Sequence, residues 1–311
     1  MLRRMLLAAS DSERTRQLIT SAPVTRGIVA RYVAGDTAEQ ALQVTRGLLN
    51  SGLLVTLDQL GEDTMDPDQA AARTAGYCAL LGQLATAGLA EGGQAEVSVK
   101  PTAVGLGLPE HGAKTAAENI RRICAAARNA GTTVTVDMED HTTVDATLRI
   151  VAELRADFPD LGCVIQSYLR RAAAESAAQA RPGQRVRLCK GAYDAPEAVA
   201  FTSRAEVDRS YARSLRALMD GPGYPMIATH DPRLIRIAAA QAALAARDPG
   251  SFEFQMLYGI RPAEQQRLAS TGAQVRVYVP FGSDWYAYLV RRLAERPANL
   301  AFFVRSLAST R

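Results

Sequence analysis

Residues 131–166 read GTTVTVDMEDHTTVDATLRIVAELRADFPDLGCVIQ, and this stretch decides the expected fold. A glycine precedes a β-rich run, Thr132–Asp137, which is followed by a helical segment, Val144–Asp157, rich in alanine, leucine, arginine and glutamate. A second glycine then precedes another β-rich run, Cys163–Gln166. Glycine just before a strand is typical of a helix C-cap followed by a short loop. The stretch therefore predicts one strand–helix–strand unit.

The same unit recurs along the chain without a residue-level repeat. Eight β-rich runs, each closely preceded by glycine, are Leu53–Leu57, Glu96–Val99, Thr132–Asp137, Cys163–Gln166, Val186–Lys190, Met226–Thr229, Phe252–Met256 and Val275–Val279. The expected helices are Pro67–Ala90, Thr115–Ala130, Val144–Asp157, Leu169–Ala180, Pro196–Met219, Pro232–Arg247, Pro262–Ser270 and Ser283–Arg296. This alternation predicts an α/β fold, a (βα)8 barrel of the TIM type. A doubly wound sheet is the alternative, but it rarely needs eight units.

The chain is expected to hold one main domain. Residues 51–298 would form the catalytic barrel, residues 1–50 an N-terminal helical arm, and residues 299–311 a C-terminal tail helix. A length of 311 residues is compatible with this division, because barrels commonly exceed 200 residues as one unit.

Composition excludes several classes of protein. Hydrophobic residues make up 48% of the chain and charged residues 22%, which is typical of a globular protein. The net charge is +4 without a run of five or six like charges, so nothing favours nucleic-acid binding. No apolar stretch reaches 18 residues, and no signal peptide is apparent. The four cysteines are far apart, as expected for reduced thiols in the cytoplasm.

Polar residues gather where the expected strands end. In a barrel enzyme the active site lies at the C-terminal ends of the strands. These ends carry Lys100, Asp137, Glu139, Gln166, Lys190, His230, Gln255 and Tyr278. Alternation within the strands predicts that valines face the helices and that this polar set points inward. Arg187 and Arg276 would then be buried charges that need partners, and the available carboxylates are Glu253, Asp137 and Glu139.

Several chemistries remain open from the residues alone. Lys190 is a candidate Schiff-base nucleophile for an aldolase, or a ligand for a cofactor phosphate. On the last expected helix, Arg291 and Arg292 could clamp a carboxylate together with Lys100, in an enzyme or in a non-catalytic binding barrel. The alternative for that helix is a solvated face with an Arg291–Glu295 pair. No metal site is predicted, because the chain has no His-x-His pair or HExxH motif.

Seven motifs in order resemble the proline dehydrogenase family in its short monofunctional bacterial form. They are VTVDMEDHTTVD (134–145), VIQSYLRR (164–171), VRLCKGAYDAPE (186–197), IATHD (227–231), FEFQMLYGIRP (252–262), RVYVPFG (276–282) and YAYLVRRLAERPAN (286–299). The resemblance implies a distorted (βα)8 barrel that binds FAD. It also implies oxidation of L-proline to Δ1-pyrroline-5-carboxylate, the first step of proline catabolism to glutamate. Hydride would pass from proline to flavin N5, and the reduced flavin would pass its electrons to a membrane quinone. The protein would then contact the membrane peripherally.

The resemblance also implies a role for individual residues. The proline carboxylate would be bound by Lys100, Arg291 and Arg292, and the ring would be contacted by Leu257, Tyr278 and Tyr288. Asp137 and Arg187 would be the catalytic pair. The FAD would be held by Met138, Gln166, Arg187, Lys190, Gly191, Thr229 and His230. No oligomeric state is implied.

Overall fold

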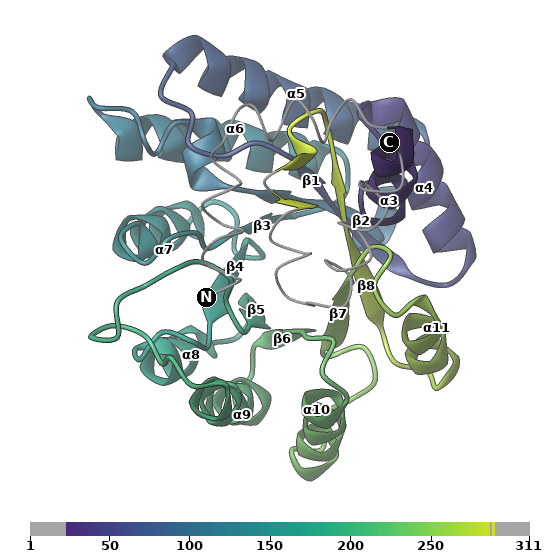
Figure 1. Cartoon of the computed structure of the whole chain (residues 1–311), viewed down its shortest axis with the longest axis vertical. Coiled ribbons are helices and arrows are strands. Elements are labelled where there is room, and N and C mark those ends of the chain that lie inside the picture. The colour runs from purple at the N-terminus through teal and green to yellow at the C-terminus, as the bar shows by residue number, and fades with distance from the viewer. Residues whose placement is uncertain (1–22, 287, 290–311) are drawn as a thin grey trace.

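The computed structural model describes residues 23–286 and 288–289, and its centre is a closed barrel (Figure 1). Eight parallel strands pair in chain order, and β8 closes the ring by pairing with β1. The strands are β1 (Leu54–Gln59), β2 (Ala95–Val99), β3 (Val134–Val136), β4 (Gly162–Gln166), β5 (Arg185–Cys189), β6 (Tyr224–Ala228), β7 (Glu253–Leu257) and β8 (Val275–Phe281). The predicted (βα)8 barrel is therefore confirmed.

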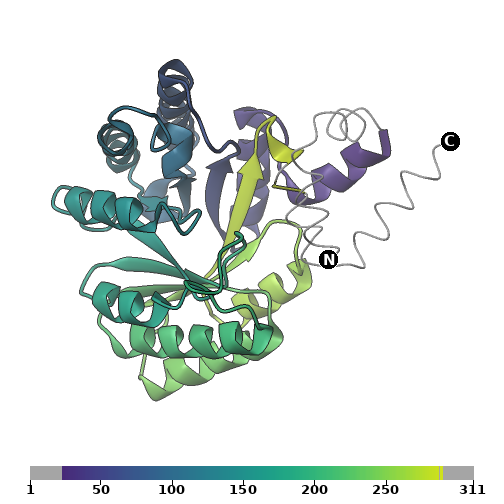
Figure 2. The same ribbon diagram turned by 60° about the vertical axis from the view of Figure 1, so that its left-hand side comes forward.

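Helices surround this ring, as Figure 2 shows from a second direction. Those along the barrel are α5 (Pro67–Thr86), η1 (Glu91–Gly93), η2 (Pro101–Val104), α6 (Gly112–Asn129), α7 (Val144–Leu154), α8 (Ala172–Gln179), α9 (Arg204–Asp220), α10 (Pro232–Leu244) and α11 (Pro262–Ser270). The described part of residues 1–50 forms α3 (Pro23–Tyr32) and α4 (Ala38–Asn50). The expected tail helix, 299–311, lies outside the described residues. Within the described ranges, every helix is too short or too polar to cross a bilayer.

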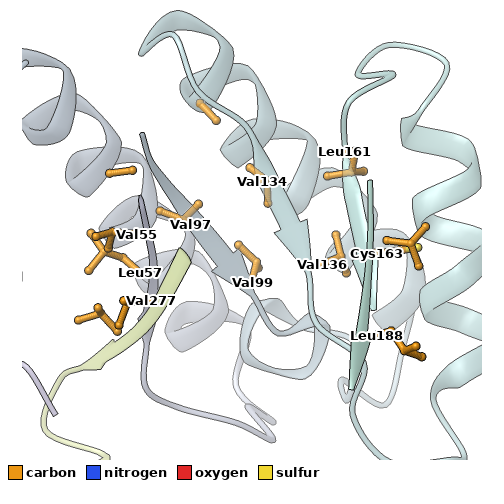
Figure 3. Packing of buried hydrophobic residues seen from close by; sticks show 14 of the residues in the cluster. Val55, Leu57, Val97, Val99, Val134, Val136, Leu161, Cys163, Leu188 and Val277 are labelled. Carbon is orange, nitrogen blue, oxygen red and sulfur yellow. The ribbon is translucent and has the colours of Figure 1, made fainter. Parts of the chain in front are cut away.

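Apolar side chains on the outer face of the strands join barrel and helices (Figure 3). Val97 and Val99 on β2 and Val134 and Val136 on β3 are buried in the same cluster as residues of α6. The residues between them along each strand point the other way, because successive side chains of a strand alternate. The valines thus face the helices, and the polar residues of the same strands face the inside of the barrel.

The largest difference from the expected elements is the start of α9. The sequence predicted a helix from Pro196, but α9 begins at Arg204, where the Ser203 hydroxyl accepts a hydrogen bond from the Glu206 N–H (3.2 Å). Ser203 is a side-chain N-cap, which fixes the helix start. Before it, the chain forms an antiparallel bridge between Ala200 and Leu169. The proline therefore stands in a long loop.

The N-terminal arm is joined to the end of β8. The Ala34 N–H donates to the Pro280 carbonyl (2.9 Å). Gly259 has φ +73°, and a Cβ there would lie 1.8 Å from the Arg31 carbonyl oxygen, so the close approach requires glycine. A small buried cluster, which we call the arm cluster, consists of Tyr32, Val33, Leu60, Tyr288 and Leu289.

Candidate active site

The predicted site residues lie at the C-terminal ends of the strands, which we call the mouth of the barrel. Neighbouring strands β8, β1, β2 and β3 make one half of the mouth, and β4 to β7 make the other. The first half carries Lys100, Asp137 and Tyr278. The second carries Gln166, Lys190, Gly191, Thr229, His230 and Leu257. Most residues implied for the substrate thus lie in the first half and most of those implied for the cofactor in the second, with Leu257 and Met138 as the exceptions.

Asp137 is the meeting point of the first half. Its Oδ1 accepts hydrogen bonds from Arg187 Nη1 (2.6 Å) and Ser98 Oγ (2.8 Å), and its Oδ2 accepts one from the Tyr278 hydroxyl (2.7 Å). Burial, reinforced by the Asp137 carboxylate, raises the pKa of Tyr278, so the phenol remains a donor. Of the three carboxylates that the sequence left available, Asp137 is thus the partner of Arg187.

Arg187 joins the two halves of the mouth. It projects from β5, reaches Asp137 after β3, and donates through Nε to Gln255 Oε1 on β7 (2.6 Å). Its guanidinium carbon lies 5.2 Å from the centre of the Tyr278 ring, a cation–π distance. The buried Arg187 side chain therefore contacts residues on or just after three other strands, β3, β7 and β8.

Lys100 has a partner that the sequence did not indicate. Its ammonium donates to Asp58 Oδ2 (2.6 Å), and both side chains are buried. Burial alone would lower the pKa of Lys100, but the carboxylates of Asp58, Glu62 and Asp137 together outweigh it and hold the pKa above its usual value. Asp58 was missed because the first strand was expected to stop at Leu57. The strand continues to Gln59, and the alternation that places Thr56 inside also places Asp58 inside.

Glu139 was one of three carboxylates available to the buried arginines, and in the described structure it pairs with Thr102 instead. Its carboxylate accepts hydrogen bonds from the backbone N–H (2.9 Å) and the hydroxyl of Thr102, which lies on η2. Its own backbone carbonyl accepts a hydrogen bond from Gln166 Nε2 (2.8 Å). Burial raises the pKa of Glu139 to about 7, although the Thr102 hydrogen bonds oppose this shift.

Lys190 lies between two carboxylates. Its ammonium donates to Asp208 (2.6 Å) and Asp231 (3.2 Å), and its side chain keeps 28% exposure. Two ion pairs thus hold the Lys190 ammonium, whereas a Schiff-base nucleophile must present a free amine to its substrate. The geometry therefore disfavours the aldolase alternative.

The remaining residues of the second half are held by local contacts. Nε2 of His230 accepts a hydrogen bond from the Leu257 N–H (2.9 Å), so a neutral His230 carries its proton on Nδ1. The Thr229 hydroxyl accepts a hydrogen bond from the Asp231 N–H (3.1 Å). Gly191 has φ +98°, and a Cβ there would lie 2.2 Å from the Tyr168 ring. That ring packs in a buried cluster with Met138.

The donors of the second half fit a flavin nucleotide, which presents ring nitrogens, carbonyl oxygens and phosphates. Amide, ammonium, imidazole and guanidinium donors come from Gln166, Lys190, His230 and Arg187. Nη2 of Arg187 is buried and has no hydrogen-bond acceptor among the described residues, and it lies 3.9 Å from Glu96. The Arg187 guanidinium therefore keeps one strong donor, on its Glu96 side, without an acceptor in the described part of the chain.

Two implied substrate residues, Arg291 and Arg292, lie outside the described residues. Tyr288 is described: it is buried in the arm cluster, beside Tyr32 and Leu60. The structure thus joins the end of the arm to one residue implied for the substrate, which the sequence did not indicate.

The opposite end of the barrel, which we call the floor, is also charged. Arg276 donates to Glu253 (2.8 Å), one of the three carboxylates left available by the sequence, and Glu96 lies 2.7 Å from Arg185. Burial alone would raise the pKa of Glu96, but Arg185, Arg276 and Arg187 lower it to about 2. Glu96 was missed, although it shares the inward face of Ser98. A cavity of about 590 Å³ at this end is lined by Arg185, Arg276 and Glu96, far from the mouth.

The chain is similar to known proteins over most of its length. Residues 41–305 match the family model described as proline dehydrogenase. The chain is 38% identical over 308 residues to proline dehydrogenase 1 of Bacillus subtilis (strain 168), covering 99% of both chains. It is 39% identical over 282 residues to proline dehydrogenase of Deinococcus radiodurans, covering 90% of both. The solved structure of proline utilization A (PutA) from Bdellovibrio bacteriovorus, inactivated by N-propargylglycine, gives a TM-score of 0.81 at 25% identity, covering 92% of this chain but 34% of that one.

Proposed function

The chain belongs to the proline dehydrogenase family, and on that premise we propose that it oxidises L-proline to Δ1-pyrroline-5-carboxylate with bound FAD. The observation that carries the proposal is the position of Arg187. Its guanidinium contacts Asp137 in the half of the mouth that carries Lys100 and Tyr278, and Gln255 in the half that carries the expected cofactor ligands. A substrate in one half and a cofactor in the other would meet beside it.

The substrate half supplies binding and orientation. Lys100, with Arg291 and Arg292, would bind the proline carboxylate, because forked, charge-assisted hydrogen bonds fix both position and direction. Asp58 keeps the Lys100 ammonium charged and in one place. Leu257, Tyr278 and Tyr288 would contact the ring, so that its C5 is held at a reactive distance.

The cofactor half supplies hydrogen-bond donors. FAD, when bound, supplies the hydride acceptor for this two-electron oxidation. Arg187 would donate toward the N5 region and Gln166 toward the pyrimidine side. Residues Met138, Lys190, Gly191, Thr229 and His230 would hold the rest of the molecule. Donors fixed before the reaction lower the cost of charge that develops on the acceptor.

We infer that the electrons leave to a membrane quinone, which requires peripheral contact of a cytoplasmic protein with the membrane. This part of the proposal is tested by turnover with a quinone in lipid vesicles. Faster reduction of vesicle-bound quinone than of the same quinone in detergent supports membrane contact, and equal rates contradict it.

The absorption spectrum of the purified protein tests the central claim. A flavin spectrum that bleaches on addition of L-proline is the expected result. A colourless protein that borohydride traps covalently on a substrate would instead identify the aldolase. A flavin-free protein that binds proline without turnover would identify a carboxylate-binding barrel.

The carboxylate clamp gives a sharper test of the substrate half. Arg292→Ala is expected to raise the KM for L-proline by a factor that corresponds to about 2–3 kcal/mol of lost binding free energy, because a charge-assisted pair is lost. The flavin spectrum should stay unchanged. Steady-state kinetics with the flavin content measured in parallel decides the point, and an unchanged KM contradicts the clamp.

A further inference from the structure

One buried acid at the mouth has no role in the reaction as described so far. Glu139 follows β3 and is 3% exposed, and its carboxylate accepts two hydrogen bonds from Thr102. Among the described residues no cation forms an ion pair with it. A buried carboxylate without such a partner costs free energy, and groups of this kind are concentrated at functional sites.

Glu139 is bonded to a residue of the cofactor half through its main chain. Its carbonyl oxygen accepts the hydrogen bond from Gln166 Nε2 (2.8 Å), and both residues are buried. A carboxamide has a donor end and an acceptor end, so this bond decides how the Gln166 amide is oriented. The position of the peptide after Glu139 therefore sets the direction of Gln166.

On its other side, Glu139 is bonded to the loop after β1 through Thr102. The Thr102 hydroxyl accepts a hydrogen bond from the Asp63 N–H (3.1 Å), and its carbonyl accepts one from the Thr64 N–H (3.2 Å). The same hydroxyl donates to the Glu139 carboxylate. Hydrogen bonds on either side of Glu139, joined through its own covalent frame, thus connect this loop to Gln166.

We propose that Glu139 is a positioning residue for the cofactor: Thr102 holds its carboxylate, and its carbonyl in turn holds the Gln166 amide toward the flavin. This inference rests on the proposed function, since it assigns Gln166 to FAD. It adds two residues to that function, Glu139 and Thr102, which form a relay to Gln166. Neither residue is assigned a contact with substrate or flavin.

The relay depends on the charge of Glu139. A carboxylate accepts both Thr102 hydrogen bonds well, whereas the protonated acid has one good acceptor oxygen left. Burial raises the pKa of Glu139 to about 7, with Lys100 lowering it and Glu62 raising it. The relay is therefore expected to hold Gln166 more firmly at about pH 8 than at about pH 6.

The first test changes Thr102, which leaves the acid itself in place. In the holoenzyme, Thr102→Val removes the hydroxyl and is expected to weaken FAD binding roughly tenfold and to shift the flavin absorption bands. Thr102→Ser keeps the hydroxyl and should restore both. Thr132→Val is the matched control, because it deletes another buried hydroxyl, which donates to the Ala95 carbonyl (2.8 Å) at the floor.

The second test removes the charge. Glu139→Gln should hold FAD as weakly at about pH 8 as the wild type does at about pH 6, and its affinity should not change between these values. If this variant does not fold, the serine and valine variants of Thr102 still decide the question. Equal FAD affinity and equal spectra in the wild type and in Thr102→Val overturn the proposal, and so does an equal loss in Thr132→Val.

A double-mutant cycle separates a relay from a general loss of stability. If Thr102 acts through Gln166, Thr102→Val should have no further effect on FAD binding in a Gln166→Leu background. Additive effects contradict the relay. A wild-type protein that binds no flavin refutes the proposed function instead, so the two failures are distinguishable.

Discussion

The mouth and the floor of the barrel each contain a buried arginine, and the two are held differently. At the floor, Arg276 donates to the Glu253 carboxylate (2.8 Å) and to the carbonyls of Val55 (2.9 Å) and Gly93 (3.1 Å). Facing the mouth, Arg187 donates, within the described part of the chain, to side chains alone, those of Gln255, Ser98 and Asp137. Main-chain acceptors in strands and turns are fixed by the fold, whereas side chains can turn toward a ligand.

The buried acids of the two ends differ in the same sense. Glu96, near the floor, is surrounded by arginines that outweigh its burial and lower its pKa to about 2. Glu139, at the mouth, is held by neutral Thr102, and burial raises its pKa to about 7. The floor therefore keeps its charges at any ordinary pH, and the mouth contains a group that titrates. From this comparison we expect the floor to stabilise the barrel and the mouth to respond to ligands.

The largest expected effect belongs to the floor. Arg276→Met removes a positive charge beside Glu253 and Glu96. It should therefore lower the free energy of unfolding by about 3–5 kcal/mol. Denaturant unfolding of the holoenzyme measures this loss. The flavin spectrum should stay that of the wild type, and a changed spectrum would contradict the division between the two ends.

The next effect concerns pH. The unfolded chain releases the Glu139 proton at its usual pKa near 4.5, whereas the folded protein keeps it to about 7. The folded state thus binds more protons in this range, and its stability falls as the pH rises from about 4.5 to 7, by up to about 3 kcal/mol. Unfolding of Glu139→Gln at several pH values should lack this slope. Glu118→Gln, at an exposed position, should retain it.

A smaller loss of stability is expected for the arginine at the mouth. Arg187→Met should cost about 2 kcal/mol, because Asp137 keeps its hydrogen bonds from Ser98 and Tyr278. Unlike Arg276→Met, it should change the flavin occupancy or midpoint potential, measured by absorption and redox titration. An unaltered flavin together with a loss as large as that of Arg276→Met would remove the distinction between the two arginines.

The smallest effect compares two tyrosines. Tyr278→Phe loses a hydrogen bond to Asp137 (2.7 Å), and Tyr224→Phe loses one to Glu253 (3.1 Å). Each should cost about 1 kcal/mol of stability. Only the first should change the KM for L-proline, because Tyr224 begins β6 at the floor. A change in KM for Tyr224→Phe would show that the ends are coupled.

The fold was predictable because each unit repeats the same local signals. A glycine, a β-branched run and a helical segment are short-range features, and eight of them in order leave few topologies. The helix bounds were less predictable: α9 begins at its Ser203 cap and not at Pro196, because the bridge at Ala200 holds the intervening loop. Such a tertiary contact has no local signal.

The sequence predicted which residues belong to the site better than it predicted which of them contact one another. Alternation placed Asp137, Arg187 and Tyr278 inside the barrel, and the structure brings them together. Pairing depends on which side chains from distant strands come within reach. Asp58 was therefore recognised as the partner of Lys100 only once the structure showed that β1 extends beyond Leu57. Glu139 is bonded to a threonine that lies next to it in space, and not to an arginine.

The arm cluster has a consequence for the order of events during synthesis. Tyr32 and Val33 are made well before their partners Tyr288 and Leu289, which lie on the far side of the barrel strands in the sequence. The ring of strands also waits for β8, which pairs with β1. A nascent chain therefore holds an exposed apolar arm until its partners emerge, and the barrel and the arm cluster are completed close together in time.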